Sequence, residues 1–92
     1  MDNRTQEDIL DELYDYTNQI NVYTRNEYKL SVFIEYRDMT EGYADGDWVM
    51  KVAQGLAKEH GLEVQTIGDT DGLDLVFEDR NAIYNDPQYT QY

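Results

Sequence analysis

The stretch EYKLSVFIEYR, residues 27–37, decides the fold because its polar and apolar side chains alternate. A period of two is typical of a strand with one buried and one solvent-facing side. The side expected to cover a core carries Tyr28, Leu30, Val32, Ile34 and Tyr36. Just upstream, residues 22–24 are expected to form a short partner strand, joined through a turn at Arg25 and Asn26.

Further upstream, residues 6–19 have the period of an amphipathic helix, with Thr5 as its N-cap. Its apolar stripe consists of Ile9, Leu13, Tyr16 and Ile20, widened by Leu10. A second stripe carries the carboxylates of Asp8, Asp11, Glu12 and Asp15, with Glu7 beside them. The two stripes lie about 130° apart around the helix axis. We therefore expect one side of this helix to be buried while the other presents a line of acids.

Downstream of the strand, residues 38–46 are expected to form a loop that leads into a second helix. This helix is expected to begin at Gly46 or Trp48 and to end at His60. Its expected N-cap is Asp45 or Asp47. Gly61, followed by a hydrophobic residue, predicts a Schellman stop. Gly55, in the middle of the helix, is expected to allow close packing on the sheet.

Two short strands follow, at residues 62–67 and 73–78, and the linker 68–72 predicts a hairpin turn. The order of elements is thus α-β-α-β-β. A β-α-β crossover followed by a hairpin predicts a two-layer α+β fold, with a small, mostly antiparallel sheet of three to four strands and two helices on one face. We expect residues 1–80 to form a single acidic domain and residues 81–92 a polar, tyrosine-containing tail that is partly flexible.

The composition offers little for catalysis. The chain has no cysteine, and His60 and Ser31 are its only histidine and serine, which excludes Cys–His and Ser–His–Asp nucleophiles. His60 suits the end of a helix, where a cation is favoured. We expect no enzymatic activity, no metal site and no cofactor. Without a signal peptide or an apolar run of roughly 18 residues, the expected location is cytoplasmic, in the host cytoplasm if the protein is phage-encoded.

Charge is the strongest functional signal. Twenty acidic residues face seven basic ones, for a formal net charge of -13. Such a field repels nucleic acid and anionic membranes and attracts basic protein surfaces. In size and acidity the chain resembles the small acidic DNA mimics and the anti-CRISPR and anti-restriction proteins of phages. This resemblance, which is one of composition, implies an inhibitor whose partner is a basic, nucleic-acid-binding protein.

A row of carboxylates on a helix can approximate a row of phosphates. Residues four apart rise about 6 Å along a helix, and phosphates of one strand advance about 3.4 Å per nucleotide. Tyr43 and Trp48 are expected to anchor the contact. The expected partner-binding residues are Glu7, Asp8, Asp11, Glu12, Asp15, Asp38, Glu41, Tyr43, Asp45 and Asp47.

Three other interpretations fit the same composition. An immunity or antitoxin protein would direct the same acids at a basic nuclease. A structural or regulatory subunit would assemble through its tyrosine-rich surface, because tyrosine is enriched in interfaces. An acidic surface can also serve only solubility or adaptation to high salt.

Overall fold

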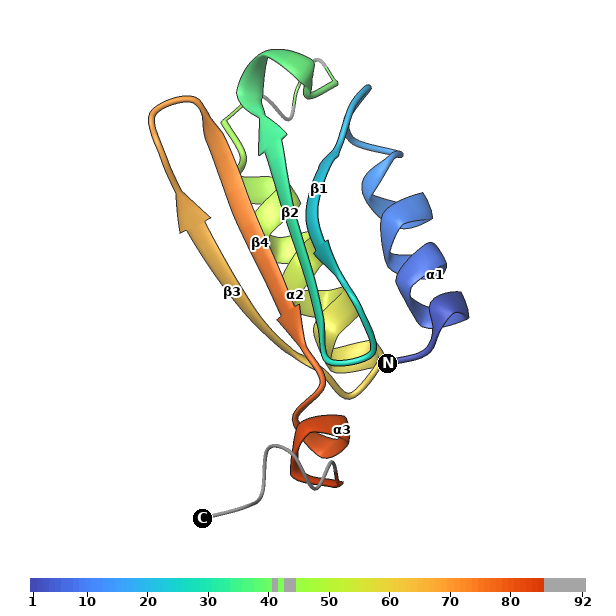
Figure 1. Ribbon diagram of the computed structural model, residues 1–92. Helices are drawn as coiled ribbons and strands as arrows, with labels where there is room; N and C mark the ends of the chain where they lie inside the picture. The colour runs from blue at the N-terminus through green and yellow to red at the C-terminus, as the bar shows by residue number, and fades with distance from the viewer. Residues whose placement is uncertain (41, 43–44, 86–92) are drawn as a thin grey trace.

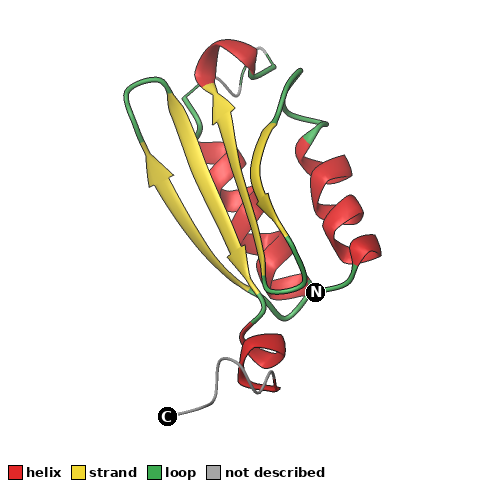
Figure 2. Ribbon diagram, in the orientation of Figure 1, coloured by secondary structure: helices red, strands yellow, loops and turns green. Residues whose placement is uncertain are grey.

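The computed structural model describes residues 1–40, 42 and 45–85, and it shows a layer of helices against one sheet (Figure 1; Figure 2). The elements in chain order are α1 (Asn3–Leu13), β1 (Asn21–Arg25), β2 (Lys29–Glu35), the 3-10 turn η1 (Tyr36–Asp38), α2 (Asp47–Glu59), β3 (Glu63–Gly68), β4 (Gly72–Glu78) and α3 (Arg80–Asn85). The expected α+β class is confirmed, and α3 is an addition to the expected order.

The four described strands form one antiparallel sheet in the order β1-β2-β4-β3. β2 pairs over its whole length with β4, from Lys29 opposite Glu78 to Glu35 opposite Gly72. The Asp69 N–H donates to the Gly72 carbonyl at 2.8 Å and closes the β3–β4 hairpin. Both the predicted hairpin and the predicted short strand before β2 are confirmed.

The core lies between the sheet and the two long helices. Leu30, Val32 and Ile34 of β2 are fully buried, as the alternation predicts. Their register partners on β4 are Phe77, Leu75 and Leu73, which are buried as well. The helices contribute Ile9 and Leu13 from α1 and Val49, Ala53 and Leu56 from α2. In Figure 1, α2 lies behind the sheet and α1 runs alongside β1.

Helix α1 begins earlier than expected. Asp2, rather than Thr5, is its N-cap, because the Asp2 Oδ1 accepts a hydrogen bond from the Thr5 N–H at 2.8 Å. That hydrogen bond is the main reason why the pKa of the Asp2 carboxyl lies below its usual value. The capping signal was therefore present in the sequence three residues upstream of the expected one.

Helix α1 also ends at Leu13, well before the expected residue 19. The Asp15 N–H bonds to a carbonyl three residues back, which tightens and closes the last turn. Thr17 then forms a β-bridge with Met39, so the segment that follows α1 is held against the residue after η1 rather than continuing as helix. Long-range pairing thus overrides the helical period of residues 14–19.

Strand β2 is shorter than the expected 27–37. Asn26 shapes the preceding turn, because its Oδ1 accepts hydrogen bonds from the N–H groups of Tyr28 and Lys29 at 2.9 and 3.0 Å. At the other end the chain leaves the sheet at Tyr36 and enters η1. The alternation continues past both ends of the strand, and so it could not mark them.

Helix α2 has the expected range but a different cap. Gly46 is its N-cap, with φ 80° and no capping side chain, instead of the predicted Asp45 or Asp47. A Cβ at Gly46 would lie 2.9 Å from the ring of Tyr36. Close packing and a left-handed backbone therefore select glycine here. The Asp45 Oδ1 accepts a hydrogen bond from the Asp47 N–H at 3.2 Å and orders the approach to the helix.

The end of α2 confirms the predicted Schellman stop. Gly61 has φ 68°, its N–H donates to the Lys58 carbonyl at 3.3 Å, and the Leu62 N–H donates to the Ala57 carbonyl at 2.7 Å. The expected role of Gly55 is wrong. This residue is exposed, and a Cβ there would meet nothing within 4 Å.

The expected tail, residues 81–92, begins inside α3. The Asp79 Oδ1 caps this helix by accepting a hydrogen bond from the Ala82 N–H at 3.1 Å. Residues 86–92 lie outside the described part of the chain. Within the described part, no helix has the length and apolar character needed to cross a membrane.

Candidate functional site

The acids of α1 face a groove that α1 forms with α2. The groove has a volume of about 310 Å³ and is lined by Asp8, Asp11, Glu12, Leu56, Glu59 and His60. It therefore combines three of the predicted acids with a fourth, Glu59, from the last turn of α2. The apolar floor comes from Leu56, which also belongs to the core.

The carboxylates of this groove are free for an external partner. Asp8, Asp11, Glu12 and Glu59 are exposed, and their side chains make no hydrogen bond or ion pair with any described residue. His60 is the one ionisable base among the lining residues. Four uncompensated carboxylates around one groove produce a concentrated negative field.

The remaining two acids expected on this helix, Glu7 and Asp15, do not line the groove. Glu7 is exposed, and its Oε1 accepts a hydrogen bond from the Asn3 side chain at 3.2 Å. Asp15 is exposed but lies in the turn after α1, because the helix ends at Leu13. The row on α1 itself, from Asp8 to Glu12, spans about 6 Å and matches roughly two nucleotide steps.

The acids expected in the loop before α2 do not join this groove. Asp38 belongs to η1, where its carbonyl accepts hydrogen bonds from the Asn18 N–H at 2.8 Å and the Thr17 hydroxyl at 3.0 Å. Asp45 and Asp47 are exposed at the start of α2, and neither lines the groove. Beside them Trp48 is 49% exposed, which suits an anchor. The other two residues expected in this loop, Glu41 and Tyr43, lie outside the described residues.

Sequence reasoning missed Glu59 and His60 as neighbours of the α1 acids. Both stand at the end of α2, and the periodicity of each helix alone does not say how two helices dock. Because Leu13 is buried in the core, the acids of α1 lie on the exposed side of the helix. The contact between α1 and α2 is a tertiary feature, which the pattern of either helix does not contain.

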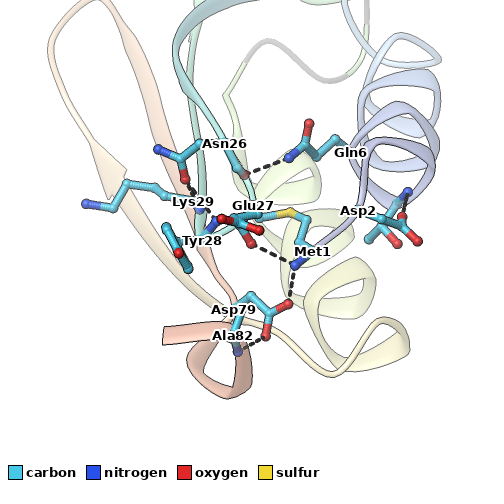
Figure 3. A network of polar contacts seen from close by, with 10 residues as sticks. Met1, Asp2, Gln6, Asn26, Glu27, Tyr28, Lys29, Asp79 and Ala82 are labelled. Carbon is cyan, nitrogen blue, oxygen red and sulfur yellow. Dashed lines mark hydrogen bonds and ion pairs between the residues drawn. The ribbon is translucent and has the colours of Figure 1, made fainter. Parts of the chain in front are cut away.

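A second polar cluster joins the N-terminus to the ends of β1 and β4 (Figure 3). The Met1 ammonium forms an ion pair with Asp79 and donates to the Glu27 carbonyl at 2.7 Å. The Gln6 side chain donates to the Asn26 carbonyl at 2.6 Å. Burial acts to raise the pKa of the Asp79 carboxyl, but hydrogen bonds from Met1 and the Ala82 N–H outweigh it, so this pKa lies below its usual value. These groups satisfy one another, and the cluster is structural.

Comparison with known proteins gives no relative from which a function could be transferred. No family model, no curated protein and no solved structure matches this chain. Among the residues that the structure describes, no three histidine or acidic side chains are grouped so that they could hold a metal ion. The functional argument therefore rests on the geometry and charge of the chain itself.

Proposed function

We propose that this protein is an acidic inhibitor that binds the basic nucleic-acid-binding groove of a target protein, in the manner of a DNA mimic. The observation that carries the proposal is the groove between α1 and α2. Four exposed carboxylates surround it, none of them with a partner among the described residues, in a chain with a net charge of -13. Lysine and arginine side chains that normally bind phosphates would find comparable acceptors here.

The arrangement supports binding more than mere solubility, because the charges are concentrated and fixed. Asp8, Asp11 and Glu12 project from one rigid helix, and like charges at such spacings repel by a few tenths of a kcal/mol per pair. A surface selected only for solubility does not require this unfavourable clustering. A basic partner would convert the repulsion into attraction and accelerate association.

The experiment is affinity capture from a bacterial lysate at low and high salt, with the eluted proteins identified by mass spectrometry. The bait is the full chain, alongside the triple variant Asp8→Asn, Asp11→Asn, Glu12→Gln. A matched control triple, Glu27→Gln, Asp69→Asn, Asp71→Asn, removes the same charge from exposed positions outside the groove.

The proposal expects a basic, nucleic-acid-binding protein that is captured by the wild type and the control triple. It should be lost from the groove triple and released as salt rises. Capture of a basic nuclease whose binding to this chain is not reduced by added nucleic acid would instead identify an immunity protein. Capture that is equal for both triples, or self-association that survives high salt, would contradict the role of the groove and favour an assembly subunit.

A further inference from the structure

The face of the sheet opposite the helices is a second candidate surface. α1 and α2 both pack on the side of the buried core residues, so the alternate residues point away from it. The register places Asn21, Thr24, Ser31, Phe33, Gln65, Ile67, Asp74 and Val76 on this open face, with Lys29, Glu35, Glu63 and Glu78 toward its ends. Tyr23, at the irregularity of β1, joins this face by stacking on Phe33. In Figure 1 this face is turned toward the viewer.

The middle of the open face is aromatic and apolar. Tyr23 of the edge strand β1 stacks on Phe33 of β2, with ring centroids 6.3 Å apart and an interplanar angle of 23°. Tyr23 is 65% exposed and Ile67 of β3 is 50% exposed. Large apolar side chains gathered on an otherwise uncovered face are typical of a contact surface.

One carboxylate lies within this apolar row. In the register of the sheet, Asp74 of β4 stands between Phe33 on one side and Ile67 on the other. Directly opposite cross-strand residues have Cβ atoms about 4.5–5.5 Å apart, so the three side chains are neighbours. Asp74 is partly buried, and its carboxylate has no hydrogen bond or ion pair with any described residue.

The other acids of this face have cations close by. Glu35 pairs with Arg37 at 3.1 Å, and Glu63 pairs with Arg80 at 2.7 Å. Glu78 stands opposite Lys29 in the register. Asp74 is thus the acid at the centre whose charge is left uncompensated, next to a pair of stacked rings.

We propose that this face binds an arginine side chain of a basic protein, with Asp74 as the receptor for the guanidinium and the Tyr23–Phe33 pair as its stacking platform. A guanidinium can donate two parallel hydrogen bonds to a carboxylate and also lie flat on an aromatic ring. A lysine ammonium cannot do both with the same geometry.

The net charge of the chain favours an arginine-bearing protein over the other ligands that an aromatic sheet face could bind. Stacked rings also bind bases of single-stranded nucleic acid, but the net charge of -13 repels phosphates. The same charge opposes a second copy of this chain. The face belongs to the layer opposite the α1–α2 groove, so the inference does not rest on the function proposed for that groove.

The test is an NMR titration of the full ¹⁵N-labelled chain with a blocked Gly-Arg-Gly-Arg-Gly peptide and its lysine counterpart. We expect the largest amide shifts at Tyr23, Phe33, Ile67 and Asp74, and an affinity for the lysine peptide that is several-fold lower. Asp74→Asn should weaken arginine binding about tenfold. The matched control Glu27→Gln removes one exposed charge in the β1–β2 turn and should change the affinity less than about twofold.

A second variant separates lost recognition from lost folding. Tyr23→Ser, at an exposed position of the edge strand, should retain a native spectrum and reduce the preference for arginine over lysine. The inference is overturned if the peptide shifts cluster at Asp8, Asp11 and Glu12, or if Asp74→Asn and Glu27→Gln weaken binding equally. It is also overturned if the face binds single-stranded DNA, or if its shifts depend on protein concentration without peptide.

Discussion

Gly72 and Gly55 show how differently two glycines of one chain are used. At Gly72 a Cβ would lie 2.3 Å from the Ile34 carbonyl oxygen and 2.9 Å from the Glu35 Cα, both of which are backbone atoms. At Gly55 a Cβ would meet nothing within 4 Å. The first glycine allows β4 to approach β2, whereas the second only weakens α2.

Replacing each of these two glycines with alanine should change the stability of the protein in opposite directions. Gly72→Ala should lower the free energy of unfolding by about 1–3 kcal/mol, because the backbone of β2 must move. Gly55→Ala should raise it by about 1 kcal/mol, through better helix propensity. Urea denaturation followed by circular dichroism measures both. Equal stability of the two variants would show that the β2–β4 approach is not as close as described.

The ion pair of Asp79 with the Met1 ammonium makes a pH-dependent contribution to the free energy of unfolding. Because the pKa of Asp79 is lowered in the folded chain, its stabilisation is present above about pH 4 and is lost as the pH falls through the lowered folded value. Asp79→Asn keeps a good cap for α3 but removes the charge. We expect it to cost up to about 1 kcal/mol at pH 7 and almost nothing at about pH 2. A pH-independent difference in urea denaturation would refute the charge effect.

Among the helices and strands, the sequence predicts type far better than it predicts ends. The alternation of β2 and the Gly61 stop of α2 are local signals, and both are confirmed. The end of α1 is set by Thr17 and Met39, which are far apart along the chain, so no local pattern contains it. The cap at Gly46 was missed because two aspartates, which are preferred capping residues, flank it. The cap at Asp2 was missed because Thr5, with an acid three residues later, resembles a capping box.

The segment after α1 is held by one buried side chain, and this can be tested. Thr17 is 3% exposed, and its hydroxyl lies 3.0 Å from the carbonyl oxygens of both Gln19 and Asp38. Thr17→Val keeps the shape but removes the donor, and should cost about 1 kcal/mol in the free energy of unfolding. Thr5→Val, at a partly exposed position of α1, is the control and should cost less. If Thr17→Val leaves the free energy of unfolding unchanged, the backbone bridge alone ends the helix.

At the scale of the whole molecule, the high negative charge distinguishes this chain more than its shape does. The sequence correctly predicted the acids of α1 as an exposed set, since the apolar stripe had to face the core. It could not predict that Glu59 shares their groove, or that a carboxylate oxygen of Asp38 is buried at η1, because both depend on how elements dock. The open aromatic face was equally hidden until the strand order was known.

Self-repulsion predicts a salt dependence of stability. With a net charge of -13, the folded chain should be stabilised by screening when sodium chloride rises from low to physiological concentration and above. Each 1 kcal/mol gained would raise the Tm of a domain of this size by about 4–8 °C. The groove triple should show a smaller rise in thermal melts. A Tm that falls with salt would indicate that attractive pairs, not repulsion, dominate the electrostatics.

Competition between this protein and a labelled DNA duplex, for a basic protein recovered in the capture experiment, tests the proposed mimicry directly. Fluorescence anisotropy of the duplex reports its release as the protein is added. We expect full release by the wild type and the control triple, and about tenfold more protein needed when Asp8, Asp11 and Glu12 are neutralised. A duplex that stays bound while the protein joins the complex would contradict the account, because the two would then occupy different surfaces of the target.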